Sequence, residues 1–74
     1  MSEIGKKIGL KIKFERMKKG LTQEKLAELT GLHVSTIKDT ENNLKSPTVR
    51  TLEQIAKGLS IDFVDLVDVS KFEL

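Results

Sequence analysis

The 74-residue sequence has no cysteine, one histidine, one proline and no long apolar run. Because cysteine is absent, neither a disulfide framework nor a thiolate zinc site can stabilise the fold. No apolar run approaches the roughly 18 residues of a membrane-spanning helix, and the N-terminus lacks the apolar stretch of a signal peptide. We therefore expect a cytoplasmic protein without a membrane segment. Its small core must stabilise the fold alone or by pairing with a second copy.

Groups for catalysis are also scarce. The single histidine, His33, has no cysteine as a partner, and the sequence has no glycine-rich phosphate loop. A nucleophile–base pair or a metal site needs more of these groups than the chain supplies. Paired carboxylates are available for acid–base chemistry, but so short a chain offers little room for a substrate pocket. We therefore expect no enzyme, no cofactor and no metal site.

Charge is unevenly distributed along the chain, although the formal net charge is only +2. Residues 1–25 hold eight basic and three acidic residues, a net charge of +5. Residues 26–74 hold five basic and eight acidic residues, a net charge of −3. A basic segment favours a polyanion partner, and an acidic segment favours a different one. Lysine-rich helix surfaces also serve solubility alone, so charge by itself does not decide the function.

Apolar spacing and helix-ending residues divide the chain into about five helical stretches, and no run of period two predicts a strand. Ile4, Ile8 and Ile12 recur at every fourth position and mark the first helix, which Gly20 ends. Thr22 is placed to cap the second helix. We therefore expect an all-α fold.

The third stretch runs from His33 to about Asn42, and its spacing predicts that Ile37, Glu41 and Leu44 point inward. The asparagine pair at its end suits a residue with positive φ. Leu52, Ile55, Ala56 and Leu59 form the apolar stripe of a fourth helix.

Either Ser46 or Thr48 caps this fourth helix, and with Ser46 the proline would occupy the first helical position. A short fifth helix is expected to start at Asp62. The expected organisation is one helix-turn-helix domain over residues 1–68 and a C-terminal tail over residues 69–74.

The strongest signal lies between Gln23 and Thr40. Two helices that cross at roughly 90–120° through a turn of three or four residues need a small residue at their contact and a residue with positive φ in the turn. Ala27 and Gly31, four positions apart, meet these needs. Apolar residues from both helices would fill the space between them, namely Leu26, Leu32 and Ile37.

These residues resemble the Cro/repressor-like helix-turn-helix family, also called the XRE family. The resemblance covers roughly Ile8 to Val67 and is carried by four further groups of residues besides the stretch GLTQEKLAELTGL. They are Ser35-Thr36-Ile37, Glu41-Asn42, Ser46-Pro47-Thr48 and LEQIAKGL at 52–59. The resemblance implies a five-helix lambda-repressor-like DNA-binding domain with its helix-turn-helix at about 22–42. It also implies a third helix in the major groove and a dimer on two half-sites about 34 Å apart.

The resemblance also implies roles for single residues. Gln23 is expected to contact DNA at the N-terminus of the second helix. Arg16 is expected to pair with Glu41 in a semi-buried structural ion pair that ties the first helix to the end of the recognition helix.

The outward face of the third helix provides the candidate base contacts. Successive helical residues differ by about 100°, so Val34, Lys38 and Asn42 form one outward stripe. We predict base contacts from His33, Val34, Ser35, Lys38 and Asp39. Lysine suits guanine O6 and N7, and serine suits several base edges.

Three of these residues allow two interpretations each. His33 reaches either a base or a phosphate. Val34 either touches a thymine methyl group or belongs to the apolar pocket between the helices. Asp39 either accepts a hydrogen bond from cytosine or acts as a filter that rejects other bases.

Phosphate contacts are expected from polar and basic residues at the rim of this face. They are Thr22, Gln23, Asn42, Asn43, Lys45, Ser46 and Arg50. Such contacts position a protein on DNA without specifying the sequence. The partial positive charge at the start of the second helix would assist them.

Two positions depart from the family pattern. Thr40 stands where a larger apolar residue is usual, and we expect its hydroxyl to bond the carbonyl four residues earlier, at a stability cost of about 1–2 kcal/mol relative to isoleucine. Asn43 stands where glycine is usual. Leu10, Phe14 and Met17 form a second stripe on the first helix, which either packs beneath the fifth helix or meets a partner.

We therefore predict a sequence-specific transcriptional regulator that binds double-stranded DNA as a homodimer, a repressor or controller of phage, plasmid or restriction-modification type. Dimerisation is expected through the fourth and fifth helices and the tail, unless the tail is frayed. The alternative is an antitoxin or anti-repressor-like module that uses the same fold to bind a protein. Asp39 and the acidic tail favour this alternative.

Overall fold

The computed structural model describes residues 3–70. These residues form five helices and no strand, which are α1 (Glu3–Lys18), α2 (Gln23–Thr30), α3 (Val34–Glu41), α4 (Val49–Leu59) and α5 (Phe63–Val67). The predicted all-α fold is therefore confirmed. The predicted tail begins at Val69, and its residues 71–74 lie outside the described part of the chain. Within residues 3–70, no helix is both long and apolar enough to cross a membrane.

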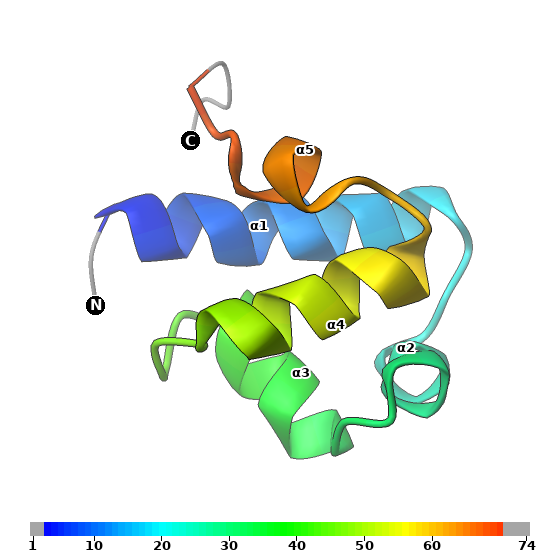
Figure 1. Ribbon diagram of the computed structural model, residues 1–74. Coiled ribbons are helices and arrows are strands. Elements are labelled where there is room, and N and C mark those ends of the chain that lie inside the picture. Colours follow the sequence, from blue (N-terminus) through cyan, green and yellow to red (C-terminus); the bar gives the residue numbers. More distant parts are fainter. Residues whose placement is uncertain (1–2, 71–74) are drawn as a thin grey trace.

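The core is built by all five helices. Figure 1 shows α1 spanning the molecule, with α5 on one side of it and α4, α3 and α2 on the other. Every helix contributes at least one fully buried side chain, and these are Ile12, Leu26, Ile37, Ile55, Leu59 and Leu66. Because each helix is short, it is this shared burial rather than helix propensity that stabilises the fold.

Three helices end in the same way, with a left-handed residue followed by a reversal of the chain. After α1 this residue is Gly20, after α3 it is Asn43 (φ 56°) and after α4 it is Ser60 (φ 58°). In each case the next amide donates to the carbonyl five residues earlier, with N···O distances of 2.8–3.0 Å. This is the Schellman motif, which satisfies carbonyls that the helix end leaves free. The sequence predicted a helix end at Gly20 and a residue with positive φ in the asparagine pair, but it carried no such signal at Ser60.

The left-handed turn at Asn43 corrects one prediction. Leu44 was expected to point inward with Ile37 and Glu41, but it is 65% exposed. The helical spacing no longer applies to Leu44, because its amide bonds the carbonyl of Asp39 across the turn instead of continuing the helix. Ile4, at the start of the predicted stripe on α1, is also exposed.

Side-chain caps fix the starts of α2 and α4. The Thr22 hydroxyl accepts a hydrogen bond from the Lys25 amide at 3.0 Å, as predicted. The Thr48 hydroxyl accepts one from the Thr51 amide at 3.1 Å. The cap of α4 is therefore Thr48 and not Ser46.

Two glycines inside helices allow close helix contacts. A Cβ atom on Gly9 of α1 would lie 2.5 Å from the carbonyl oxygen of Thr40, at the end of α3. A Cβ atom on Gly58 of α4 would lie 2.5 Å from the methyl carbon of Thr30, at the end of α2. Both distances are far below normal contact, so α1 and α4 approach their neighbours closely only because these positions lack a side chain.

The second apolar stripe of α1 faces outward. Phe14 and Met17 are exposed, and Leu10 is half-buried. Lys18 Nζ lies 5.3 Å from the centre of the Phe14 ring, a cation–π contact that shields part of the ring. Of the two alternatives for this stripe, packing beneath α5 is therefore wrong for its C-terminal half.

Candidate nucleic-acid interface

α2 and α3 form the helix-turn-helix unit. Gly31 takes φ 74° directly after α2, and His33 precedes the first residue of α3. Leu26 and Ile37 are fully buried between the helices, and Leu32 and Val34 pack partly against them. Val34 therefore belongs in part to the apolar pocket, one of the two interpretations that the sequence allowed.

The outer face of α3 holds the other predicted base-contacting residues. His33, Ser35 and Lys38 are exposed, and Asp39 is partly buried. His33 occupies the cap position of α3, but its side chain makes no capping hydrogen bond. Its imidazole is therefore not engaged in stabilising the helix start.

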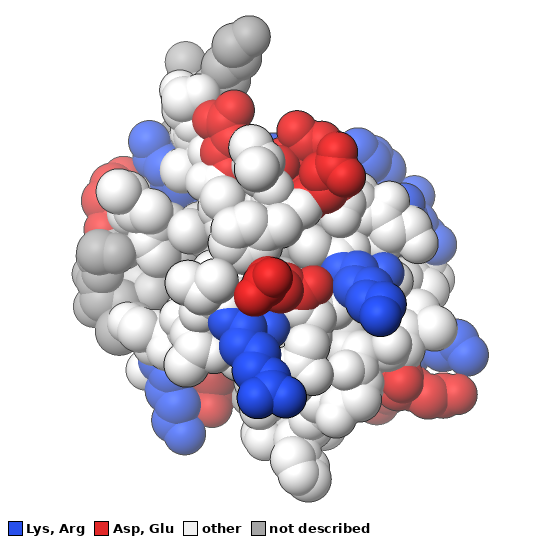
Figure 2. Space-filling view, viewed as in Figure 1, with Lys and Arg blue, Asp and Glu red and all other residues white. Residues whose placement is uncertain are grey.

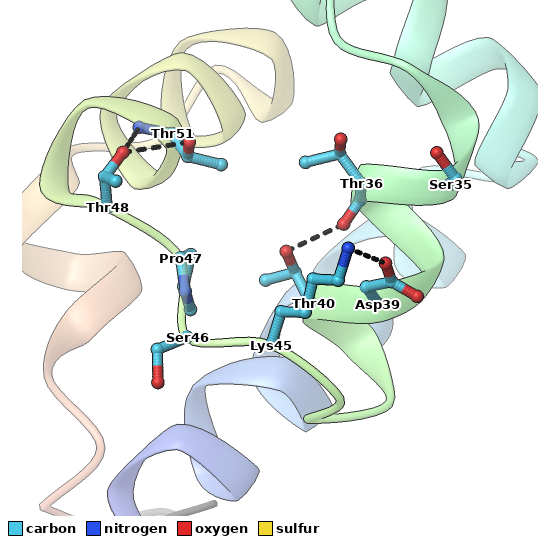
Figure 3. Close-up of a pocket in the computed structure, with 9 residues that line it drawn as sticks. All are labelled: Ser35, Thr36, Asp39, Thr40, Lys45, Ser46, Pro47, Thr48 and Thr51. Carbon is cyan, nitrogen blue, oxygen red and sulfur yellow. Dashed lines mark hydrogen bonds and ion pairs between the residues drawn. The ribbon is translucent and has the colours of Figure 1, made fainter.

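A hollow of about 190 Å³ lies beside α3, between this helix and the segment that leads into α4. Figure 3 shows its lining, in which most of the side chains carry hydroxyl groups. The lining residues are Ser35, Thr36, Asp39, Thr40, Lys45, Ser46, Pro47, Thr48 and Thr51. The structure thus brings two predicted base-contacting residues, Ser35 and Asp39, next to two predicted phosphate-contacting residues, Lys45 and Ser46.

Asp39 has a cationic neighbour at the rim of this hollow. Lys45 Nζ lies 3.7 Å from Asp39 Oδ2, and the lysine side chain is 79% exposed. Figure 3 shows the amine directed toward the carboxylate. An exposed pair of this kind contributes little stability. It does place a positive charge beside the one acidic group on the candidate DNA-binding face of α3, which reduces the repulsion between that group and phosphates.

The hydrogen bond predicted for the Thr40 hydroxyl is present. Its side chain is buried, and its hydroxyl donates to the carbonyl oxygen of Thr36 at 2.8 Å. The hydroxyl is thereby satisfied inside the helix.

Arg16 and Glu41 form a bidentate ion pair in the interior. Arg16 Nε lies 2.7 Å from Glu41 Oε2, and Arg16 Nη2 lies 3.1 Å from Glu41 Oε1. The side chains are only 11% and 1% exposed. Arg16 Nη1 also donates to the carbonyl oxygen of Leu21 at 2.7 Å. One guanidinium group therefore joins the end of α1, the turn before α2 and the end of α3.

Gln23 belongs to the same network. Its side-chain nitrogen donates to Glu41 Oε1 at 3.1 Å, and the residue is partly buried. Separate roles were predicted for Gln23 and Glu41, one toward phosphate and one toward Arg16, and the hydrogen bond between them was missed. Their separation of 18 positions hid this contact, which exists only because α2 and α3 cross near these two residues.

The remaining phosphate candidates lie around the same face. Thr22, Asn42, Lys45, Ser46 and Arg50 are exposed and Asn43 is half-buried, at the start of α2, the end of α3 and the start of α4. The start of α2 lies at the end of α3, where Gln23 bonds Glu41, and the segment that leads into α4 lines the hollow beside α3. Polar and basic groups thus lie next to α3, where a protein that inserts a helix into a DNA groove makes its phosphate contacts.

Three acidic side chains around α5 lie away from this face. Asp62, Asp65 and Asp68 are exposed on or beside α5, and Figure 2 shows acidic groups over that part of the molecule. In Figure 1, α5 and α3 lie on opposite sides of α1. These three carboxylates are therefore remote from α3, whereas Asp39 and Glu41 lie on α3 itself.

The sequence profile of the helix-turn-helix family HTH_3 matches residues 12–66. The chain belongs to this XRE-type helix-turn-helix family. The matched range runs from the middle of α1 into α5, so the family's shared sequence includes both the helix-turn-helix unit and the helices that support it.

Two known proteins are similar to this chain in sequence. The HTH-type transcriptional regulator SutR of Escherichia coli (strain K12) is 35% identical over 63 residues, which are 85% of this chain and 35% of SutR. The ImmF control region 10 kDa protein of Bacillus phage phi105 is 36% identical over 58 residues, which are 78% of this chain and 64% of the phage protein. The chain thus spans about a third of the length of SutR and less than two thirds of the length of the phage protein.

A solved structure in the family is similar over the whole chain. The wild-type restriction-modification controller protein C.Esp1396I has a TM-score of 0.87 and 31% sequence identity, covering 100% of this chain and 99% of that chain. The same controller bound to a 25 base pair operator site has a TM-score of 0.85 and 32% identity, covering 99% and 100%. The five-helix fold of this chain is therefore also the fold of a protein observed on operator DNA.

Proposed function

We propose that this protein is a sequence-specific DNA-binding transcriptional regulator that places α3 in the major groove. The observation that carries the proposal is the exposed face of α3, next to polar and basic groups at the ends of three helices. The similarity to an operator-bound controller of the same length supports it. The protein would act in the cytoplasm, where its DNA lies, and without catalysis.

The residue roles follow from position. His33, Ser35 and Lys38, with Val34 and Asp39 at the edge, are proposed to contact bases. The rim residues are proposed to contact phosphates, and these are Thr22, Gln23, Asn42, Asn43, Lys45, Ser46 and Arg50. Because Asp39 has Lys45 beside it, we favour its acting as a filter against wrong bases over a direct bond to cytosine.

We further propose that the protein binds as a homodimer on two half-sites. One α3 contacts only a few base pairs, so two copies about one helical turn apart are needed for useful specificity. Exposed Val64 on α5 offers an apolar contact for a second copy. The position of α5, away from α3, leaves the DNA-binding face free in such a dimer.

Selection of bound sites from a random duplex pool, followed by salt titration, tests the function. We expect an enriched motif with two related halves about 10 base pairs apart. With about six phosphate contacts per copy, log K should fall against log[salt] with a slope near −5 per copy. A failure to enrich any motif, with weak binding that barely responds to salt, would contradict the proposal and favour the protein-binding alternative.

A further inference from the structure

We infer that Glu41 is a positioning residue for DNA binding, because it holds the Gln23 side-chain amide at the DNA-facing start of α2. This inference rests on the proposed function and adds to it. If Glu41 bonded Arg16 alone, its role would be limited to the stability of the fold. Through Gln23, the buried ion pair also prepares a hydrogen-bond donor for a phosphate.

The chemistry of the two side chains fixes the orientation of the amide. A glutamine amide has an oxygen that only accepts hydrogen bonds and a nitrogen that carries two donors. A carboxylate only accepts. The nitrogen of Gln23 therefore faces Glu41, at 3.1 Å, and the reversed amide would place two acceptors in contact. One N–H is used inward, and the second N–H on the same nitrogen is left for a phosphate oxygen.

The acceptor itself cannot move. Both oxygens of Glu41 are bonded to Arg16, and the glutamate side chain is 1% exposed. Arg16 is held in turn by the carbonyl of Leu21, two residues before Gln23. The amide is thus attached to a rigid, buried group rather than to a mobile surface side chain. A donor ordered before binding loses less conformational entropy on binding, so its contact with phosphate is stronger.

The location suits this role. Gln23 is the first residue of α2, directly after the cap Thr22. Free backbone N–H groups at a helix start attract anions. A phosphate that approaches these groups would meet the Gln23 nitrogen within the same region. The ion pair is buried beneath this contact and does not itself reach the DNA.

A double-mutant cycle on DNA affinity separates positioning from folding. Gln23→Met removes the amide while keeping a side chain of similar length. We expect it to weaken operator binding about tenfold in the wild-type protein, the loss of one hydrogen bond to a charged group. In an Arg16→Met, Glu41→Met background the amide is no longer held, and Gln23→Met should weaken binding less than about twofold. The apolar pair is chosen because it leaves no buried charge unpaired.

Arg50→Ala serves as the matched control. This exposed residue lies on the rim and outside the network, so its effect should be the same in both backgrounds. An equal loss for Gln23→Met in both backgrounds would overturn the inference and leave DNA binding intact. A wild-type protein that binds no duplex would instead overturn the proposed function.

A second measurement tests the inference even if the Arg16→Met, Glu41→Met variant does not fold. Gln54, the other glutamine of the chain, provides an internal reference for side-chain motion. In the free wild-type protein, the side-chain ¹⁵N{¹H} NOE of Gln23 should match that of the α2 backbone, and that of Gln54 should be lower. Equal, low values for the two amides would overturn the inference.

Discussion

Arg16 and Glu41 occupy a position where removing one partner has a larger effect than replacing both. Glu41→Ala would leave the guanidinium of Arg16 in the interior with only the Leu21 carbonyl as a partner. We expect a loss of about 3 kcal/mol in the free energy of unfolding, which lowers Tm by more than about 10 °C in a domain of this size. Thermal unfolding followed by circular dichroism measures this.

Glu53→Ala is the control for this loss, since Glu53 is an exposed acidic residue on α4. It should change Tm by only a degree or two. An unchanged Tm for Glu41→Ala would show that the pair contributes no net stability.

Lys38 and Arg50 should differ in how they affect specificity. Lys38 lies on the outer face of α3, and Arg50 lies at the start of α4. Lys38→Ala should weaken the preferred site by about 1–3 kcal/mol and relax the choice of base at one position. Arg50→Ala should weaken all sequences alike and reduce the salt slope by about one. Competition binding to a set of single-base operator variants measures both effects, and a uniform loss for both would contradict this division of roles.

Single residues were predictable from the sequence where the cause was local. The Thr22 cap, the positive φ of Asn43 and the Thr40 hydroxyl bond all depend on neighbours within four residues. The inward orientation predicted for Leu44 was wrong, because the left-handed turn before it interrupts the helical spacing. The Gln23–Glu41 bond was missed because it depends on how two helices cross.

At the scale of the helices, Gly9 and Gly58 should respond differently to alanine. Alanine normally favours a helix by about 1 kcal/mol over glycine. Gly9→Ala should nevertheless destabilise the protein by about 2 kcal/mol or more, because the new Cβ would meet backbone carbonyls of Thr40 and Glu41 that cannot move aside. Chemical denaturation measures the change.

Gly58→Ala gives the matched comparison, since its Cβ would clash with the methyl group of Thr30 and would lie at ordinary contact distance, 3.5 Å, from Leu26 Cδ1. We expect a smaller loss, about 1 kcal/mol. Adding Thr30→Ser removes that methyl group and keeps the hydroxyl that donates to the Ala27 carbonyl, so it should restore stability. Absence of rescue, or a neutral Gly9→Ala, would show that the helices can separate without cost.

The helices themselves were predictable from apolar spacing and end signals, and their boundaries agree closely with the structure. The packing of the helices against one another was harder to predict from the sequence. Gly9 and Gly58 carry no apolar or polar side chain that a periodicity can detect, although they determine how closely α1 and α4 approach their neighbours. A glycine inside an otherwise helical pattern is the available signal for such a contact.

For the whole molecule, the proposed dimer predicts a change in association when α5 is altered. Val64 is 69% exposed on α5. Val64→Lys would place two like charges at a two-fold contact, so we expect the dimer to dissociate at least tenfold more readily. Sedimentation velocity at several concentrations measures this. Leu29→Lys, a similar change at an exposed position on α2, should leave association unchanged.

A wild-type protein that stays monomeric at all concentrations would contradict the dimer proposal, and so would a Val64→Lys variant that associates normally. The sequence assigned the dimer contact to the fourth and fifth helices and the tail. It could not decide between such an interface and a frayed tail, because apolar residues among acids are consistent with both.

The separation of the acidic side chains around α5 from the face of α3 has a kinetic consequence. The three carboxylates around α5 are repelled by a polyanion, and this repulsion favours orientations in which α5 points away from the DNA before any atom touches. A larger fraction of encounters with DNA would then begin with α3 facing the duplex, which raises the association rate constant. Exchanging Asp62, Asp65 and Asp68 for asparagine would remove this alignment and slow association at low salt, and the effect would fade as salt screens the field.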